Sequence, residues 1–121
     1  MENKVYDLEE RTRLFAFNTR QFIKRLPRTI GNVEDAKQLV RSSGSVGANY
    51  IEANESLGKK DFLMRIKICR KEAKESGYWL SLLDLGSDEV MIADCNKLYQ
   101  ESNELMKIFG AILTKSAMKA E

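Results

Sequence analysis

The feature that most constrains this fold is a hydrophobic stripe whose members alternate by four and three residues. One such stripe spans residues 62–83, and a second with the same rhythm spans residues 91–112. Residues spaced in this way share one side of an α-helix and pack with the left-handed crossing typical of helical bundles. The two stripes therefore predict two long helices, each with one buried side. Their members are Phe62, Ile66, Cys69, Ala73, Ser76, Leu80 and Leu83, followed by Met91, Cys95, Leu98, Ser102, Leu105, Phe109 and Ile112.

Two more helices are predicted ahead of this pair. The first is expected to begin after Asp7, whose carboxylate caps the first turn in a pair with Glu10, and to be ended by Pro27. The second is expected from residue 33 to about residue 54, with Asn32 as its N-cap. The chain thus offers four helical segments in a row.

The middle of the second predicted helix, residues 42–49, consists mostly of small residues and includes two glycines. Each glycine costs about 1 kcal/mol of helix propensity relative to alanine. One interpretation is a loop that divides the segment into two short helices. The other is a single helix whose small residues let the backbone of a neighbouring helix approach closely.

Short turns are expected between these helices, with Gly86 in a left-handed conformation and Ser87 or Asp88 capping the last helix. Short connections force sequential helices to run antiparallel. The sequence therefore predicts one all-α domain over residues 1–121, an antiparallel up-and-down four-helix bundle whose tail frays from about residue 115. Its predicted core contains Phe15, Phe22, Leu39, Ile66, Cys69, Leu80, Leu98, Leu105 and Phe109.

The composition agrees with a helical protein and excludes several other classes. Charged residues make up 31% and hydrophobic residues 43% of the chain, a balance that argues against disorder. The longest uncharged stretch, residues 42–51, is too short to cross a bilayer, and the N-terminus lacks the apolar segment of a signal peptide. Cys69 and Cys95 have no CxxC spacing and are expected to be buried, reduced thiols. We therefore expect a cytoplasmic protein without a membrane partner.

The residues needed for common catalytic and metal sites are missing. The chain contains no histidine, which is the commonest general base near neutral pH and the commonest metal ligand. No glycine-rich phosphate loop, nucleophile elbow or zinc-binding spacing occurs either. Glu72 and Glu75 lie one helical turn apart, a spacing typical of a solvated or salt-bridged helix face. We expect no catalytic residue, no metal, no cofactor and no enzymatic activity.

Charge is distributed unevenly along the chain, although the net charge is only +2. Residues 11–28 contain six basic residues and no acid, and residues 59–74 contain seven basic residues against two acids. Residues 84–104 contain six acids against Lys97 alone. This pattern predicts an electrostatically lopsided molecule with a basic third helix.

Two segments resemble a known bacterial family. Residues 38–53, QLVRSSGSVGANYIEA, and residues 61–76, DFLMRIKICRKEAKES, are similar to the four-helix-bundle family named after proteins encoded in intervening sequences of 23S ribosomal RNA genes. The resemblance runs from about residue 5 to residue 109. It implies a ring-like homopentamer and a family of poorly defined biochemical role. A protein of the same bundle class, the accessory protein of diversity-generating retroelements, is similar in architecture and binds nucleic acid, which makes RNA or DNA a candidate partner by analogy.

The first hypothesis about function is an oligomeric nucleic-acid-binding module. Several cations surround the start and the exposed side of the third helix, where they can neutralise phosphates together. The alternative for this surface is a solvated helix face whose lysines pair with the acids of the next helix. No RNA-binding motif or stacking aromatic platform is evident, so sequence-specific recognition is not expected. The candidate residues are Lys59, Lys60, Lys67, Arg70, Lys71 and Lys74.

The second hypothesis is a structural assembly protein whose partner is another protein. Its signal is a polar stripe on the second helix, which in an oligomer faces Arg65 or Arg70 of a neighbouring chain. The predicted oligomer interface comprises Ser42, Ser45, Asn49, Glu52 and Arg65.

Overall fold

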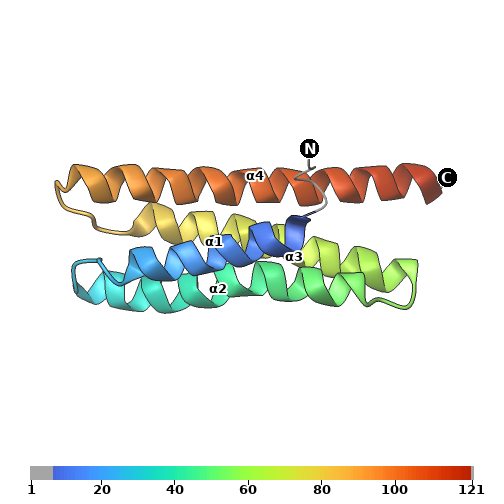
Figure 1. The fold of residues 1–121 in the computed structure, drawn as a ribbon, viewed down its shortest axis with the longest axis horizontal. Helices are drawn as coiled ribbons and strands as arrows, with labels where there is room; N and C mark the ends of the chain where they lie inside the picture. Colours follow the sequence, from blue (N-terminus) through green and yellow to red (C-terminus); the bar gives the residue numbers. More distant parts are fainter. Residues whose placement is uncertain (1–6, 121) are drawn as a thin grey trace.

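The protein is built from four α-helices and, within residues 7–120, no β-strand. The computed structural model describes residues 7–120, with side chains up to residue 117. The helices are α1 (Leu8–Ile23), α2 (Ile30–Asn54), α3 (Lys59–Leu82) and α4 (Glu89–Ala120). Sequential helices run antiparallel and are joined by short turns (Figure 1). The predicted fold class, an antiparallel up-and-down four-helix bundle, is confirmed.

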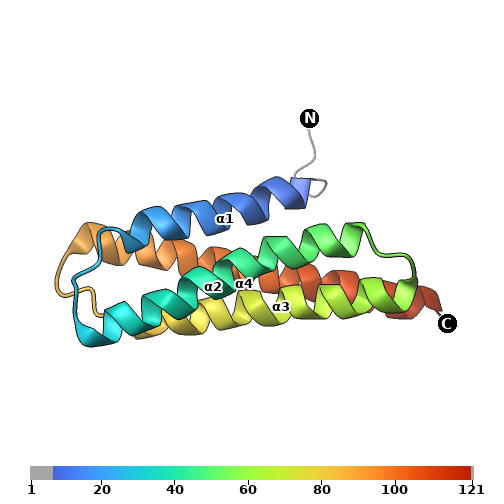
Figure 2. The same ribbon diagram turned by 90° about the horizontal axis from the view of Figure 1, so that it is seen from below.

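Each helix packs on two neighbours in the order α1, α2, α3, α4 and back to α1. The helices differ in length, because α1 has 16 residues whereas α4 has 32. Both ribbon views show that α1 stops short of the end of the bundle where the C-terminus lies, so that this end contains only α2, α3 and α4 (Figures 1 and 2). One side of α3 faces α2, another faces α4, and its remaining surface is open.

The core combines the two predicted stripes, on α3 and α4, with buried side chains of α1 and α2. All nine residues predicted to be buried are buried, and Leu39, Ile66, Leu105 and Phe109 have no exposed surface. Tyr50 of α2 extends the core by packing against Phe109 of α4, with the two ring centroids 5.9 Å apart. Burial of these side chains supplies the main stabilising free energy of the bundle.

Helix α2 continues without a break through its small-residue segment. A methyl group added at Gly47 would lie 2.9 Å from the Thr12 hydroxyl oxygen of α1, so the absence of a side chain permits the close approach of these two helices. The interpretation as a single helix is therefore confirmed, and the interpretation as a loop is wrong. Packing offsets the low helix propensity of the glycines.

Three predicted details at the ends of α1 and α2 are wrong. The Asp7 side chain makes no capping hydrogen bond, and Glu10 binds Arg13 within the same helix instead. Helix α1 ends at Ile23, one turn before Pro27. The N-cap of α2 is Thr29, whose hydroxyl oxygen accepts a hydrogen bond from the Asn32 amide. Asn32 itself lies in the first turn of α2.

The predictions for the turn between α3 and α4 are confirmed. Gly86 adopts a φ of 62°, the left-handed conformation that glycine tolerates best. Of the two candidate caps, Asp88 is the one that accepts hydrogen bonds from the first amides of α4, at Val90 and Met91. Helix α4 extends to Ala120, and the fraying expected from about residue 115 stays a prediction.

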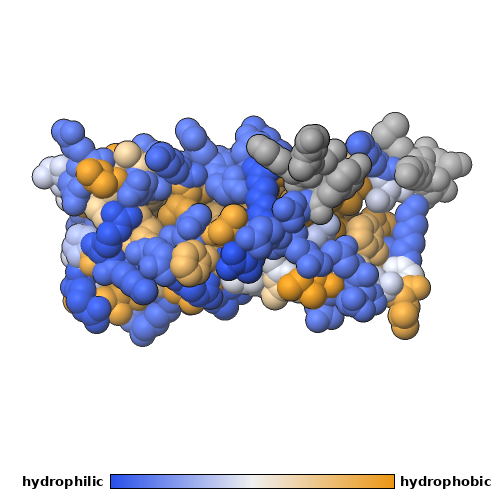
Figure 3. Space-filling model, in the orientation of Figure 1, coloured by the Kyte–Doolittle hydropathy of each residue, from blue (hydrophilic) through white to orange (hydrophobic). Residues whose placement is uncertain are grey.

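None of the described helices combines the length and apolarity needed to cross a bilayer. On the face that carries α1, hydrophobic residues form separate patches among hydrophilic ones (Figure 3).

Candidate nucleic-acid interface

A band of cations covers the open surface of α3. Lys60, Lys67, Lys71 and Lys74 are all exposed, and their spacing places them on the side of the helix opposite the buried stripe. We call this set, together with Lys59 and Arg70, the basic face. The structure therefore brings all six predicted residues onto one surface.

Two members of the basic face lie toward α4. The Lys59 ammonium group donates a hydrogen bond of 3.0 Å to the carbonyl of Ser116. The Arg70 side chain passes Gly110, where an added methyl group would be 3.8 Å from its Cδ atom. The basic face thus extends from the open surface of α3 to its boundary with α4.

A hollow of about 480 Å³ opens on this boundary. It is lined by Arg70, Lys71 and Lys74 of α3 and by Met106 of α4. Three cations therefore share one depression with the apolar side chain of Met106.

Two acids of α4, Asp94 and Glu101, are bound to cations of α1 and of the turn that follows it. The Arg11 guanidinium group donates two hydrogen bonds, of 2.7 and 2.9 Å, to the Glu101 carboxylate, and this pairing raises the pKa of Arg11. Arg25 binds Asp94 at 2.8 Å. Among the described residues no carboxylate of α4 lies within 4 Å of a cation of the basic face, so the alternative in which the lysines of α3 pair with the acids of the next helix does not hold there.

The basic face retains most of its charge without a counterion. Among the described residues, Lys71 is its one member with a carboxylate oxygen within 4 Å, that of Glu72 at 3.8 Å. Exposed pairs at such a distance contribute little to stability. Phosphate oxygens would consequently find the cations of this face available.

The carboxylates on the α2 side of α3 are already engaged. Arg41 of α2 lies between two of them, 3.4 Å from Glu72 and 3.1 Å from Glu75. The indole nitrogen of Trp79 also donates to Glu75 at 3.3 Å. The interpretation of Glu72 and Glu75 as a salt-bridged face is confirmed for this pair, although Glu72 is itself buried and one of its oxygens lacks a hydrogen bond.

The polar stripe predicted as an oligomer interface has partners within its own chain. Ser42 is wholly buried and shares a 2.9 Å hydrogen bond with Ser76, so it offers no surface to another chain. The Asn49 side chain receives a 2.9 Å hydrogen bond from Arg65 and donates one to Ser45. Glu52 is exposed. Part of the stripe is thus an α2–α3 contact, and its role between chains stays a prediction.

Two exposed aromatic side chains border the basic face, and the sequence reasoning missed them. Tyr78 follows Lys74 by one turn of α3, and Tyr99 lies on α4 beside Gly77. The sequence does contain a pattern that includes Tyr99, because Ile92, Tyr99 and Met106 recur every seven residues alongside the buried stripe of α4. The two tyrosines stand on different helices, so no local sequence pattern joins them.

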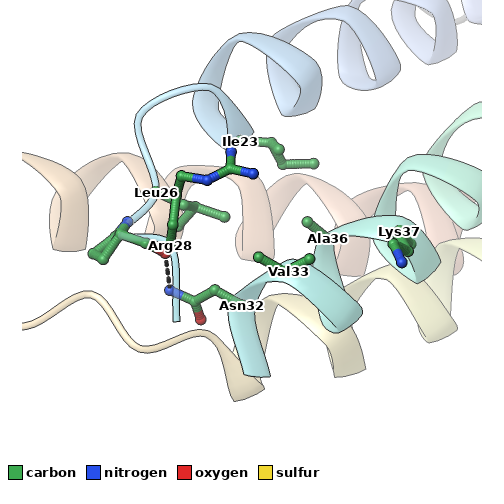
Figure 4. A pocket seen from close by; sticks show the side chains of 8 residues that line it. Ile23, Leu26, Arg28, Asn32, Val33, Ala36 and Lys37 are labelled. Carbon is green, nitrogen blue, oxygen red and sulfur yellow. Dashed lines mark hydrogen bonds between the residues drawn. The ribbon is translucent and has the colours of Figure 1, made fainter. Parts of the chain in front are cut away.

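A second depression, of about 180 Å³, lies where the chain passes from α1 to α2. Its lining is mainly apolar, with Leu26 and Val33 beside the charged rim residues Arg28 and Lys37 (Figure 4). The Asn32 amide group is occupied there, because it donates to the carbonyls of Pro27 and Asp84. The depression therefore presents no convergent set of free polar groups.

The remaining candidates for chemistry are the cysteines and the carboxylates. Burial raises the pKa of Cys69 to about 12 and also raises that of Cys95, which keeps both thiols protonated and poorly nucleophilic near neutral pH. Within the described part of the chain, no three histidine, cysteine or acidic side chains gather into a possible metal site.

The fold and this surface define a class, the small all-α four-helix bundles with a charged helix face. The sequence model of the 23S rRNA-intervening sequence protein matches residues 4–111, and the chain belongs to this family. A crystal structure from Bacteroides thetaiotaomicron, of a protein of unknown function from the S23 ribosomal protein family, is similar with a TM-score of 0.75 and 27% identity. The similarity covers 93% of this chain and 99% of that one. No curated protein matches the chain significantly.

Proposed function

We propose that this protein is a non-enzymatic homo-oligomer that binds nucleic acid through the basic face of α3. The observation that carries the proposal is the pairing pattern: α4 directs Asp94 and Glu101 to α1 and the turn after it, while among the described residues Lys71 is the one exposed cation of α3 with a carboxylate oxygen within 4 Å. Such a surface attracts phosphates because each contact releases condensed counterions from the nucleic acid.

The dimensions of the basic face suit a polynucleotide backbone. From Lys60 to Lys74 the helix rises about 21 Å at 1.5 Å per residue. Phosphates of one DNA strand recur about every 3.4 Å along the helix axis, so several of them fit beside this length. Contacts of this kind carry no sequence information. We therefore expect weak sequence preference.

Assembly would multiply these contacts. The family resemblance implies a ring-like homopentamer, which repeats the basic face around the ring. Linked weak sites bind a long polyanion far more tightly than a short one, because later contacts form within one complex. We expect affinity to increase steeply with the length of RNA or DNA.

A charge reversal tests the proposal. The triple variant Lys67→Glu, Lys71→Glu and Lys74→Glu should lose nucleic-acid binding while helicity and assembly persist, because all three side chains lie away from the core. Binding is measured by fluorescence anisotropy at low and moderate salt, and the oligomeric state by light scattering.

A matched control changes the same net charge elsewhere. Lys24, Arg28 and Lys97 are exposed on other parts of the bundle, and reversing them should leave most of the affinity intact. Equal losses in the two triple variants would show that only net charge matters, against the proposal. A monomer in solution would contradict the ring. Absence of nucleic-acid binding in the native protein would favour the structural assembly role with a protein partner.

A further inference from the structure

We propose that the open side of α3, together with its boundary with α4, binds unpaired nucleotides, whose bases stack on Tyr78 and Tyr99 while Arg70, Lys71 and Lys74 hold the phosphates. This inference rests on the proposed function and adds to it the class of nucleic acid: single strands in preference to duplexes.

The two tyrosine rings are exposed and held in place. The exposed fractions are 57% for Tyr78 and 41% for Tyr99. Tyr78 packs edge-on against Trp79 with ring centroids 5.0 Å apart. Because Gly77 lacks a side chain, Tyr99 lies close to the α3 backbone, with its ring 3.5 Å from the position that a Gly77 methyl group would take. Each ring thus has one supported edge or face and one that is open to solvent.

The cations that line the hollow lie within one or two helical turns of the two tyrosines. Tyr78 follows Lys74 by four residues, and Lys74 is one of the three cations that line the hollow with Met106. On α4, Tyr99 and Met106 are separated by about 10 Å, two helical turns, on the same side. A strand that follows the open side of α3 beside this boundary therefore meets phosphate-binding cations at the hollow, and aromatic rings one to two turns further along.

The arrangement favours unpaired nucleotides for a physical reason. In a duplex the faces of the bases are buried in the stack, so the tyrosines gain nothing from contact with its exterior. In a single strand each base presents a π face that an exposed aromatic ring can cover. The nearby carboxylate of Glu75 does not oppose the phosphates strongly, because Arg41 and Trp79 already bind it.

The experiment compares an unstructured oligo-U and an oligo-dT strand with a mixed-sequence duplex of equal length at the same salt, by fluorescence anisotropy. The variants are Tyr78→Leu and Tyr99→Leu, which remove the aromatic ring and keep an apolar side chain. We expect each to weaken single-strand binding by about tenfold and to change duplex binding by less than about twofold. Phe17→Leu on the exposed surface of α1 is the matched control and should have no effect.

Tyr99→Trp is a control for the case in which the leucine variants lose structure. It retains an aromatic ring, so it should bind single strands at least as tightly as the native protein. Oligo-U should also quench its indole fluorescence more than that of the native protein, whose one indole is Trp79. Native affinity of both leucine variants for single strands would overturn the inference, as would equal native affinity for strand and duplex. The proposed function survives those results if the lysine reversal still abolishes binding. Absence of any binding by the native protein would overturn both.

Discussion

Replacing Asn32 by alanine should destabilise the whole bundle, because this one side chain ties together the two turns at the same end of it. Its amide group donates hydrogen bonds of 2.9 Å to the Pro27 carbonyl and 2.8 Å to the Asp84 carbonyl. Its carbonyl oxygen accepts a 2.8 Å hydrogen bond from the Asp84 backbone amide. The residue is only 2% exposed, so water cannot easily replace it.

Three hydrogen bonds at about 1 kcal/mol each give an expected loss of about 3 kcal/mol in the free energy of unfolding. For a domain of this size that loss corresponds to a decrease of roughly 10 to 15 °C in the melting temperature. Asn32→Asp keeps the acceptor but places a carboxylate against two carbonyl oxygens, so its loss should be at least as large.

Urea unfolding followed by circular dichroism at 222 nm measures both variants. Asn96→Ala is the control, because Asn96 is an exposed asparagine on α4 and its loss should change stability by less than about 0.5 kcal/mol. If Asn32→Ala matched that control, the hydrogen bonds between the turns would not stabilise the fold and the reasoning would fail.

Three further predictions concern side-chain packing and burial. Leu105→Ala should cost about 2 to 5 kcal/mol in urea unfolding, because Leu105 has no exposed surface; an unchanged midpoint would contradict the helix register. Gly77→Ala should destabilise by about 1 to 3 kcal/mol, since its methyl group would lie 2.8 Å from the Ser102 hydroxyl oxygen, whereas Gly31→Ala, with nothing within 4 Å, should stabilise slightly. The thiol of Cys69 should resist alkylation at pH 8 until the protein is unfolded. Because the pKa of Cys69 is raised from 9.0 to about 12, its contribution to stability is intact below pH 9 and is lost between pH 9 and pH 12, as the unfolded chain releases a proton that the folded chain keeps.

The helices and the core could be predicted from sequence because both depend on local periodicity. The stripe through Ile66 and Leu80 specifies which side of α3 is buried whatever its neighbours are. The caps were harder to predict, since several polar residues near each helix end compete for the same amides. Asparagine is a common N-cap residue, but the Asn32 side chain bonds to Asp84 in the other turn, and Thr29 is the residue that caps α2.

The geometry of the candidate site could be predicted only in part, for a related reason. The basic face follows from the spacing of Lys67, Lys71 and Lys74 within one helix. The partner of each acid on α4 does not follow from spacing, because both neighbouring helices carry cations and only the packing decides which are within reach. The structure selects Arg11 for Glu101, 90 residues away in the chain. Tyr99 was missed because its relation to the lysines exists only between helices.

The salt dependence of nucleic-acid binding tests the central claim most directly. The native protein and the variant Lys67→Gln, Lys71→Gln and Lys74→Gln are titrated with one labelled single strand over a series of salt concentrations. The logarithm of the binding constant should decrease linearly with the logarithm of salt concentration, and the slope of the variant should be smaller in magnitude by about two, or about 0.7 for each phosphate that the variant no longer neutralises. Identical slopes for the two proteins would contradict a role for the basic face of α3 in holding phosphates.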